Sequence, residues 1–260
     1  MMWKRVGAAG IIAVTLGVTV AGNLHFKDKI QAATNNMKTV LQDAVPGGQQ
    51  QDASYTEYMK NLPEAVQTKI KQAIETKKPL QLVIAGDEAV TGWPEILTKN
   101  LQDTYGPGVF QVTVKSYPQK TTQQWVNEQI FEDIAHSKPD IVLYEPSLLV
   151  DAGVIGKQKS MSNISVILDE ITKSVPGVAI FVQPPNPLHQ AKNYPITIQL
   201  LKDSMQSKGI TYLDHWQNWP DPNGDDIVNY LENSDGWANS QGQQVWAQYL
   251  TNYFTGDQKE

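Results

Sequence analysis

The chain has 260 residues, of which 40% are hydrophobic and 18% charged, which is enough apolar material for one large folded domain. Its net charge of −6 and the lack of any basic stripe argue against a nucleic-acid partner. The sequence contains no cysteine, which excludes disulfides, thiolate catalysis and cysteine-ligated zinc.

The N-terminal segment has the pattern of an export signal or a membrane anchor. Lys4 and Arg5 precede an uncharged, largely apolar run from Val6 to Leu24, which is just long enough to span a bilayer. The positive flank of such a segment stays inside, so the rest of the chain is expected on the extracellular side of the membrane. We interpret residues 1–24 as an uncleaved anchor, with cleavage near Ala21 and secretion as the alternative.

Residues 25–54 are predicted to form a flexible stalk. The stretch Val45–Ser54 reads VPGGQQQDAS and is too polar to bury a core of its own. The folded domain is therefore expected over residues 55–260.

From Tyr55 onward, strand and helix patterns alternate. Five short apolar runs predict strands at Leu80–Ala85, Val109–Lys115, Pro139–Tyr144, Val178–Gln183 and Ile210–Leu213. Helices are predicted over Pro63–Lys77, Trp93–Tyr105, Thr121–Ser137, Ile164–Lys173, Ile196–Lys208 and Gln241–Phe254. Such alternation implies right-handed crossovers, so we predict an α/β fold: a three-layer sandwich with a five-stranded parallel sheet. Strand cores such as LVIA and IVLY are continuously apolar, as a sheet covered on both faces requires.

The loops at the carboxyl ends of these strands are the expected place for a ligand, because open α/β sheets bind ligands there. They are Gly86–Trp93, Ser116–Thr122, Glu145–Gly156, Pro184–Tyr194 and Asp214–Gly236.

Two of these loops carry motifs of a known family. Gly86–Gly92 (GDEAVTG) resembles the G-D-S-L-T-x-G start of the SGNH/GDSL hydrolases, and Asp235–Gly242 (DGWANSQG) resembles their last block, D-G-x-H-P-N-x-x-G. The resemblance covers about residues 63–255. It implies the flavodoxin-like SGNH architecture and an esterase or acetylesterase in which a Ser, a His and an Asp form the catalytic triad.

The sequence departs from that family at the residues that carry the chemistry. Glu88 stands in the place of the nucleophilic Ser and Trp237 in that of the His, while Asp235 matches the Asp. Acyl transfer needs a hydroxyl nucleophile and a base, whereas a carboxylate repels the developing oxyanion and an indole N–H cannot accept a proton. The motifs therefore predict a degenerate SGNH domain with a disabled triad.

The two middle blocks of the family are also altered. The second, Ser116–Thr122, contains no Gly to donate an N–H to an oxyanion. The third, Tyr144–Asp151, lacks the usual Asn, although Asp151 takes the place of its Asp. The resemblance thus implies that the oxyanion hole is incomplete.

A cleft without a triad could still bind a cell-wall or surface glycan. Loop aromatics at Trp93, Tyr117, Trp216, Trp219 and Trp237 could stack on sugar rings, although Trp93 and Trp237 could equally fill the vacated space. The polar candidates for such a site are Asp87, Glu145, Asp151, Gln183, Asn186 and His215.

Two catalytic alternatives remain open from the sequence. An esterase acting on cell-surface polysaccharide could use Ser147 or Ser116 with His215 or His189. The loop carboxylates could instead bind Mg²⁺ or Ca²⁺, or act as an acid/base pair on a glycosidic bond; they are Asp87, Glu88, Glu145, Asp151, Asp214 and Asp235. Against a metal site, no calcium-loop spacing is present, so no metal is expected. No cofactor is expected either.

Overall fold

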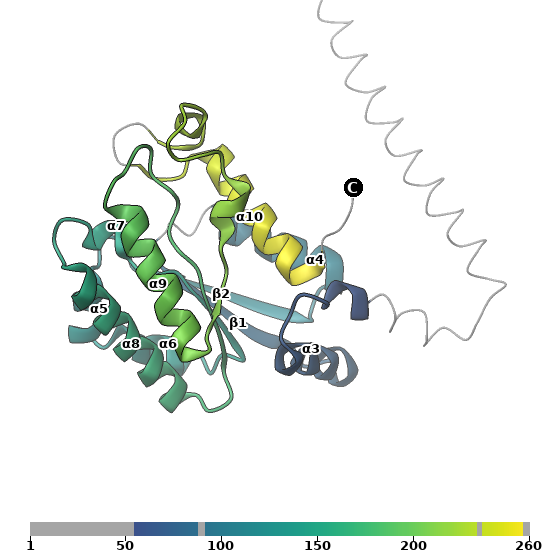
Figure 1. Ribbon diagram of the computed structural model, residues 1–260. Coiled ribbons are helices and arrows are strands. Elements are labelled where there is room, and N and C mark those ends of the chain that lie inside the picture. The colour runs from purple at the N-terminus through teal and green to yellow at the C-terminus, as the bar shows by residue number, and fades with distance from the viewer. Residues whose placement is uncertain (1–54, 88–91, 233–235, 257–260) are drawn as a thin grey trace, which may run out of the picture. The chain divides into compact units, whose positions relative to one another are not determined.

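The computed structural model describes residues 55–87, 92–232 and 236–256, and Figure 1 shows their arrangement. All of them belong to one compact unit, Ser54–Glu260. The predicted anchor and stalk, together with Glu88 and Asp235, lie outside the described residues. Within the described part, none of the helices combines the length and the apolar character needed to cross a bilayer.

A five-stranded sheet with every neighbouring pair parallel forms the centre of the domain, which confirms the predicted fold class. The strand order is β2-β1-β3-β4-β5, so the chain moves outward from β1 to β2 and then crosses back to build the other side. The strands are β1 (Leu80–Gly86), β2 (Phe110–Ser116), β3 (Ile141–Tyr144), β4 (Ala179–Val182) and β5 (Thr211–Tyr212).

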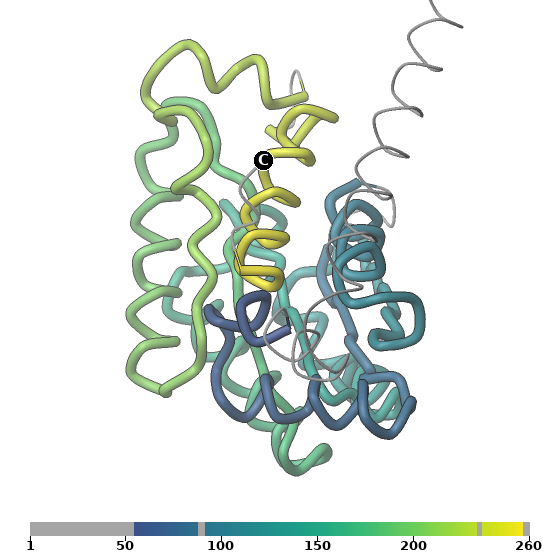
Figure 2. The backbone as a smooth tube through the Cα atoms, turned by 90° about the vertical axis from the view of Figure 1, so that its right-hand side faces the viewer, coloured from purple at the N-terminus to yellow at the C-terminus, as the bar shows by residue number. Residues whose placement is uncertain are grey.

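Helices cover both faces of the sheet (Figures 1 and 2). Leu82 and Ile84 of β1 face a core shared with α3 (Glu64–Thr76), α4 (Trp93–Tyr105) and α10 (Ser240–Thr255). Val83 and Ala85 face the opposite core, which is covered by α5 (Thr122–Asn127), α6 (Ile130–His136), α8 (Lys157–Ser174) and α9 (Tyr194–Lys208). Successive residues of a strand point to opposite faces of the sheet. Because both faces are buried here, the sequence of β1 is apolar at nearly every position.

Two helices differ from the sequence prediction. The single helix expected over Thr121–Ser137 is divided into α5 and α6, because Gln129 adopts a left-handed conformation with φ 52°. Helix α8 begins at Lys157 rather than at Ile164. Its first turns bury Ser160 and Asn163, polar residues that hide the apolar periodicity on which the prediction relied.

The segments beyond the carboxyl ends of the strands contain short elements that the sequence did not indicate. After β3 comes the single turn α7 (Leu148–Asp151), and after β5 come the 3₁₀ helices η1 (His215–Asn218) and η2 (Asp226–Tyr230). These turns place the side chains described next.

Candidate functional site

Three polar side chains follow directly on β1, β3 and β4, the three central strands of the sheet. Ala85 pairs with Tyr144, and Tyr144 pairs with Val182, so the residues that continue these strands lie at the same edge. Backbone hydrogen bonds extend the register one step further, from the Glu145 N–H to Ala85 and from the Gln183 N–H to Tyr144. The edge therefore gathers Asp87, Glu145 and Gln183, as expected from the sequence.

Asp87 is buried at the end of β1. Its Oδ1 accepts a hydrogen bond from the backbone N–H of Gln119 at 2.6 Å, whereas Oδ2 has no hydrogen-bond partner among the described residues. Burial raises the pKa of the Asp87 carboxyl to about 6, and the Gln119 N–H works in the opposite direction. Asp87 thus tethers the loop after β2 to the end of β1.

Glu145 is buried against the backbone of β1. A Cβ atom added to Gly86 would lie 2.9 Å from the Cβ of Glu145 and 3.0 Å from its Oε2. Only glycine at position 86 leaves room for this carboxyl. The negative charge of Glu145 adds to burial in raising the pKa of the Tyr194 hydroxyl well above its ordinary value.

Gln183 and Asn186 are fully buried and bind other parts of the chain. Gln183 Oε1 accepts a hydrogen bond from the Trp246 indole at 2.9 Å, and Asn186 Nδ2 donates to the carbonyl oxygens of Pro187 and Gly236. Their remaining polar atoms, Gln183 Nε2 and Asn186 Oδ1, have no hydrogen-bond partner among the described residues. Each side chain thus connects the segment after β4 to another part of the chain.

His215 is the histidine that lies deepest in the domain. Nε2 is 2.9 Å from the carbonyl oxygen of Pro184, and Nδ1 accepts a hydrogen bond from the Trp219 indole N–H, also at 2.9 Å. These partners assign the proton to Nε2. The ring stacks on Trp246 with a centroid distance of 4.2 Å, and burial lowers the pKa of His215 to about 3. Both nitrogens are engaged in the fold, so this imidazole cannot take a proton from a nucleophile.

Neither of the other two described histidines, His136 and His189, is placed to act as the base of a Ser-His pair. His189 lies in the loop after β4, where its Nε2 is 3.9 Å from a carboxylate oxygen of Asp225. His136 is exposed at the end of α6. No histidine in the described ranges is hydrogen-bonded to a serine, and Ser147 Oγ is buried there with no hydrogen-bond partner.

The fold of this domain is similar to that of several solved esterases and lipolytic proteins. No family model and no curated protein matches the sequence. An acetylxylan esterase from Geobacillus stearothermophilus, solved as a catalytic mutant, matches with a TM-score of 0.59 and 13% identity, over 68% of this chain and 94% of that chain. A protein from Desulfitobacterium hafniense DCB-2 that is described as lipolytic and of the G-D-S-L family matches with a TM-score of 0.55 and 16% identity, over 66% and 98%.

The domain has the SGNH/GDSL hydrolase fold. A carbohydrate esterase of family 3 from Talaromyces cellulolyticus supports the same conclusion, with a TM-score of 0.58 and 12% identity over 66% of this chain and 94% of that chain. At such identities the likeness establishes the architecture and leaves the chemistry to the residues themselves.

The residues that the sequence motifs align with the family triad are described only in part. Trp237, which the motif aligns with the family His, is partly buried, and its carbonyl oxygen accepts a hydrogen bond from the Glu232 N–H at 2.6 Å. Glu88 and Asp235 fall outside the described residues, so their geometry relative to Trp237 stays a prediction.

Asp151, which the sequence interpretation matches to the Asp of the third block, belongs to a buried hydrogen-bond network. Its Oδ1 accepts from the Thr122 N–H at 2.9 Å, and its Oδ2 accepts from the hydroxyls of Thr122 and Ser160, both at 2.6 Å. Asn163 Nδ2 donates to the same Thr122 hydroxyl at 3.1 Å. Asp151 therefore joins the first turn of α5 to α8.

Most of the aromatic rings considered for sugar stacking are part of the packing of this SGNH domain. Trp93 is buried and stacks on Trp246 with centroids 5.2 Å apart. Tyr117 packs edge-on against Trp125, and its hydroxyl donates to Asp133. Two further rings make indole hydrogen bonds: Trp216 to Pro185, at 2.8 Å, and Trp219 to His215.

Other residues near the edge were not singled out in the sequence. They are Lys157, Lys192 and Tyr194, which lie in or next to the predicted ligand-side loops, and that position was the available signal. As for metals, the described residues contain no group of three or more His, Cys, Asp or Glu side chains placed to hold an ion.

Proposed function

We propose that this protein is a membrane-tethered, extracytoplasmic SGNH/GDSL-like domain that binds an envelope glycan and does not hydrolyse it through a Ser-His-Asp triad. The observation that carries the proposal is the environment of His215, whose two nitrogens serve Pro184 and Trp219. The sequence adds Glu88 and Trp237 at the positions of the nucleophile and the base.

A glycan is the proposed ligand because some solved structures with a similar fold are esterases of carbohydrates. Two similar structures bear names that refer to carbohydrate esters, an acetylxylan esterase and a carbohydrate esterase of family 3. Loss of the triad removes the chemistry of such an enzyme but leaves the carboxyl edge of the sheet, which is where open α/β sheets bind ligands. The apolar, positively flanked segment of residues 1–24 supports tethering at a membrane.

The first test is an ester hydrolysis assay on the full-length chain with p-nitrophenyl acetate and acetylated xylan. We expect no turnover by the parent chain and measurable turnover by the Glu88→Ser/Trp237→His variant. The matched control is Glu88→Gln/Trp237→Phe, which alters the same positions without supplying a nucleophile or a base. Hydrolysis by the parent chain would contradict the proposal and favour an esterase with a non-standard catalytic set, in which case Ser147→Ala is the next variant.

Binding and location are tested separately. Calorimetry with deacetylated and acetylated xylo-oligosaccharides should detect association with the inert parent chain; the absence of any association would remove the glycan part of the proposal. For the tether, the chain should stay with membranes after alkaline extraction, whereas a chain lacking residues 1–24 should be released.

A further inference from the structure

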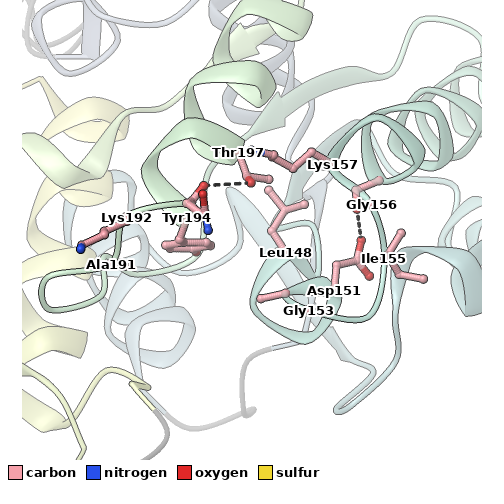
Figure 3. Close-up of a pocket in the computed structure, with 13 residues that line it drawn as sticks. Leu148, Asp151, Gly153, Ile155, Gly156, Lys157, Ala191, Lys192, Tyr194 and Thr197 are labelled. Atoms are coloured by element: carbon pink, nitrogen blue, oxygen red, sulfur yellow. Dashed lines mark hydrogen bonds between the residues drawn. The ribbon is translucent and has the colours of Figure 1, made fainter.

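Two features of the domain lie outside the proposed function, and the first is a pocket of about 570 Å³ between the α7–α8 loop and the start of α9 (Figure 3). Asp151 and Lys157 both line this pocket and carry opposite charges. The ammonium group of Lys192 points away from it (Figure 3). The lining of the pocket therefore does not select a ligand by charge.

The second feature is the free edge of the sheet at β2. This strand is the outermost one on its side, and it pairs only with β1. With seven residues it equals β1 as the longest strand of the sheet, and Phe110 is the only one of the seven that is buried. The strand at the opposite edge, β5, has two residues. The long free edge of the described domain is therefore at β2.

The backbone groups of every second residue of β2 point away from β1. The Val109 carbonyl oxygen accepts a hydrogen bond from β1 and the Tyr117 N–H donates one to β1, each at 2.9 Å, so the odd-numbered residues between them face β1. Because the N–H and C=O groups of successive residues in a strand point to opposite edges, those of Val112 and Val114 point to the open side. In the described part of the chain, no other segment forms a hydrogen bond with them.

The sequence of β2 lacks the features that usually protect a long free edge. Natural proteins protect such edges with proline, a bulge or a charged side chain, because unpaired backbone groups attract another strand. The strand reads FQVTVKS, without proline, and its register with β1 is continuous, without a bulge. Its single charge, on Lys115, is neutralised by Asp133, whose carboxylate lies 2.8 Å from the ammonium group. An edge of this kind is expected to be covered by another strand.

The residues of β2 are complementary to those of a second copy of the same strand. When two β2 strands pair antiparallel about a twofold axis at Thr113, all seven residues are paired, and the outward backbone groups of Val112 meet those of Val114 of the second copy. In this register Thr113 faces Thr113, and Gln111 faces Lys115. Apolar side chains thus meet apolar ones, polar side chains meet polar ones, and no two like charges are opposed.

We propose that two copies of this chain associate through β2, whose strands pair antiparallel and join the two five-stranded sheets into one continuous sheet. The outward backbone groups of Val112 and Val114 supply the hydrogen bonds, and Thr113 lies on the twofold axis. The inference goes beyond the proposed function and does not depend on glycan binding. The contact runs along the side of each sheet, so it is compatible with a ligand at the carboxyl ends of the strands.

The test is cysteine cross-linking of the full-length chain in detergent solution, with diamide as the oxidant. The chain contains no cysteine of its own, so each variant carries a single thiol. Thr113→Cys places two thiols at a non-hydrogen-bonded pair, where the Cα atoms lie about 4.5 Å apart, within the range of a disulfide. The matched control is Gln111→Cys, whose two copies are separated by four residues along the strand, or about 13 Å.

We expect Thr113→Cys to form the disulfide-linked dimer at least about tenfold faster than Gln111→Cys, because association raises the effective concentration of the paired thiols. In light scattering, the parent chain should have the protein mass of two chains of 28.9 kDa, and Val112→Pro that of one. Proline at position 112 removes an N–H that does not bond to β1, so the strand keeps its own place in the sheet.

Three results would overturn the inference. They are equal rates for the two cysteine variants, faster linkage of Gln111→Cys, and a single-chain mass for the parent. A two-chain mass that persists in Val112→Pro would place the contact elsewhere in the chain and would also overturn it. If circular dichroism shows that Val112→Pro is unfolded, Thr113→Lys takes its place, since it puts two like charges on the axis.

Discussion

Substitution of His215 by alanine tests whether this histidine stabilises the fold or takes part in catalysis. The variant removes the partner of the Pro184 carbonyl and of the Trp219 indole N–H, both of which remain buried. It also removes the ring that stacks 4.2 Å from Trp246. Each orphaned buried group costs about 1–3 kcal/mol, and the cavity adds to this, so we expect a loss of about 3–5 kcal/mol in the free energy of unfolding.

Urea-induced unfolding followed by circular dichroism measures this loss as a lower midpoint with an unchanged m-value. The thermal midpoint should fall by about 10 °C or more. The control is His136→Ala at the exposed end of α6, which should cost less than about 1 kcal/mol. A His215→Ala chain that keeps its stability but loses an ester hydrolysis shown by the parent would refute the structural assignment.

Three further outcomes follow from the same contacts. First, the unfolded chain binds a proton at His215 near its ordinary pKa of 6.5, whereas the folded chain does so only near a pKa of about 3, so this histidine should lower the free energy of unfolding as the pH falls from 6.5 towards 3. Asp87 acts in the opposite sense: its pKa rises from 3.8 to about 6, the folded state binds more protons in that window, and its contribution falls as the pH rises through it. Urea midpoints measured across this range should lose the first slope in His215→Phe and the second in Asp87→Asn. Second, Asp151→Ala leaves the Thr122 N–H and the hydroxyls of Thr122 and Ser160 unpaired and should cost about 3–5 kcal/mol by the same assay, against less than about 1 kcal/mol for Asp169→Ala, which removes only the exposed ion pair with Lys208. Third, Gly86→Ala should lower the free energy of unfolding by about 1–3 kcal/mol, because its Cβ would lie 2.9 Å from the Cβ of Glu145; Gly156→Ala, which meets no atom within 4 Å, should be neutral, and equal stability of the two variants would count against the packing described for Glu145.

The architecture could be predicted because it depends on local patterns. Apolar runs such as Leu80–Ala85 are too short for helices and lie between helical periodicities, which specifies a covered parallel sheet. The boundaries of helices were harder to predict from the sequence where a helix buries polar residues. Ser160 and Asn163 lie on the buried face of α8 and bind Asp151 and Thr122, so Met161 is the one buried apolar residue before Ile164 and the apolar periodicity is interrupted there.

The candidate site was predictable only in outline. Residues that follow adjacent parallel strands must lie at one edge, which is why Asp87, Glu145 and Gln183 could be grouped from the sequence. Their partners could not be predicted, because Gln183 binds Trp246 of α10 and Asp87 binds the backbone at Gln119, far along the chain. Local patterns carry no information about such contacts.

The sequence by itself therefore determined the α/β class and the parallel sheet, whereas the ligand edge and the replacement of a hydroxyl and an imidazole by Glu88 and Trp237 stay predictions from it. Only the tertiary structure decided that His215 serves the fold, because that depends on where Pro184, Trp219 and Trp246 place their polar atoms and rings around it. It also decided that Lys157, at the start of α8, and Lys192, in the segment before α9, line one pocket. The physical reason is the same in both cases: residue type and spacing fix which face of an element is buried, whereas long-range packing fixes which side chains meet.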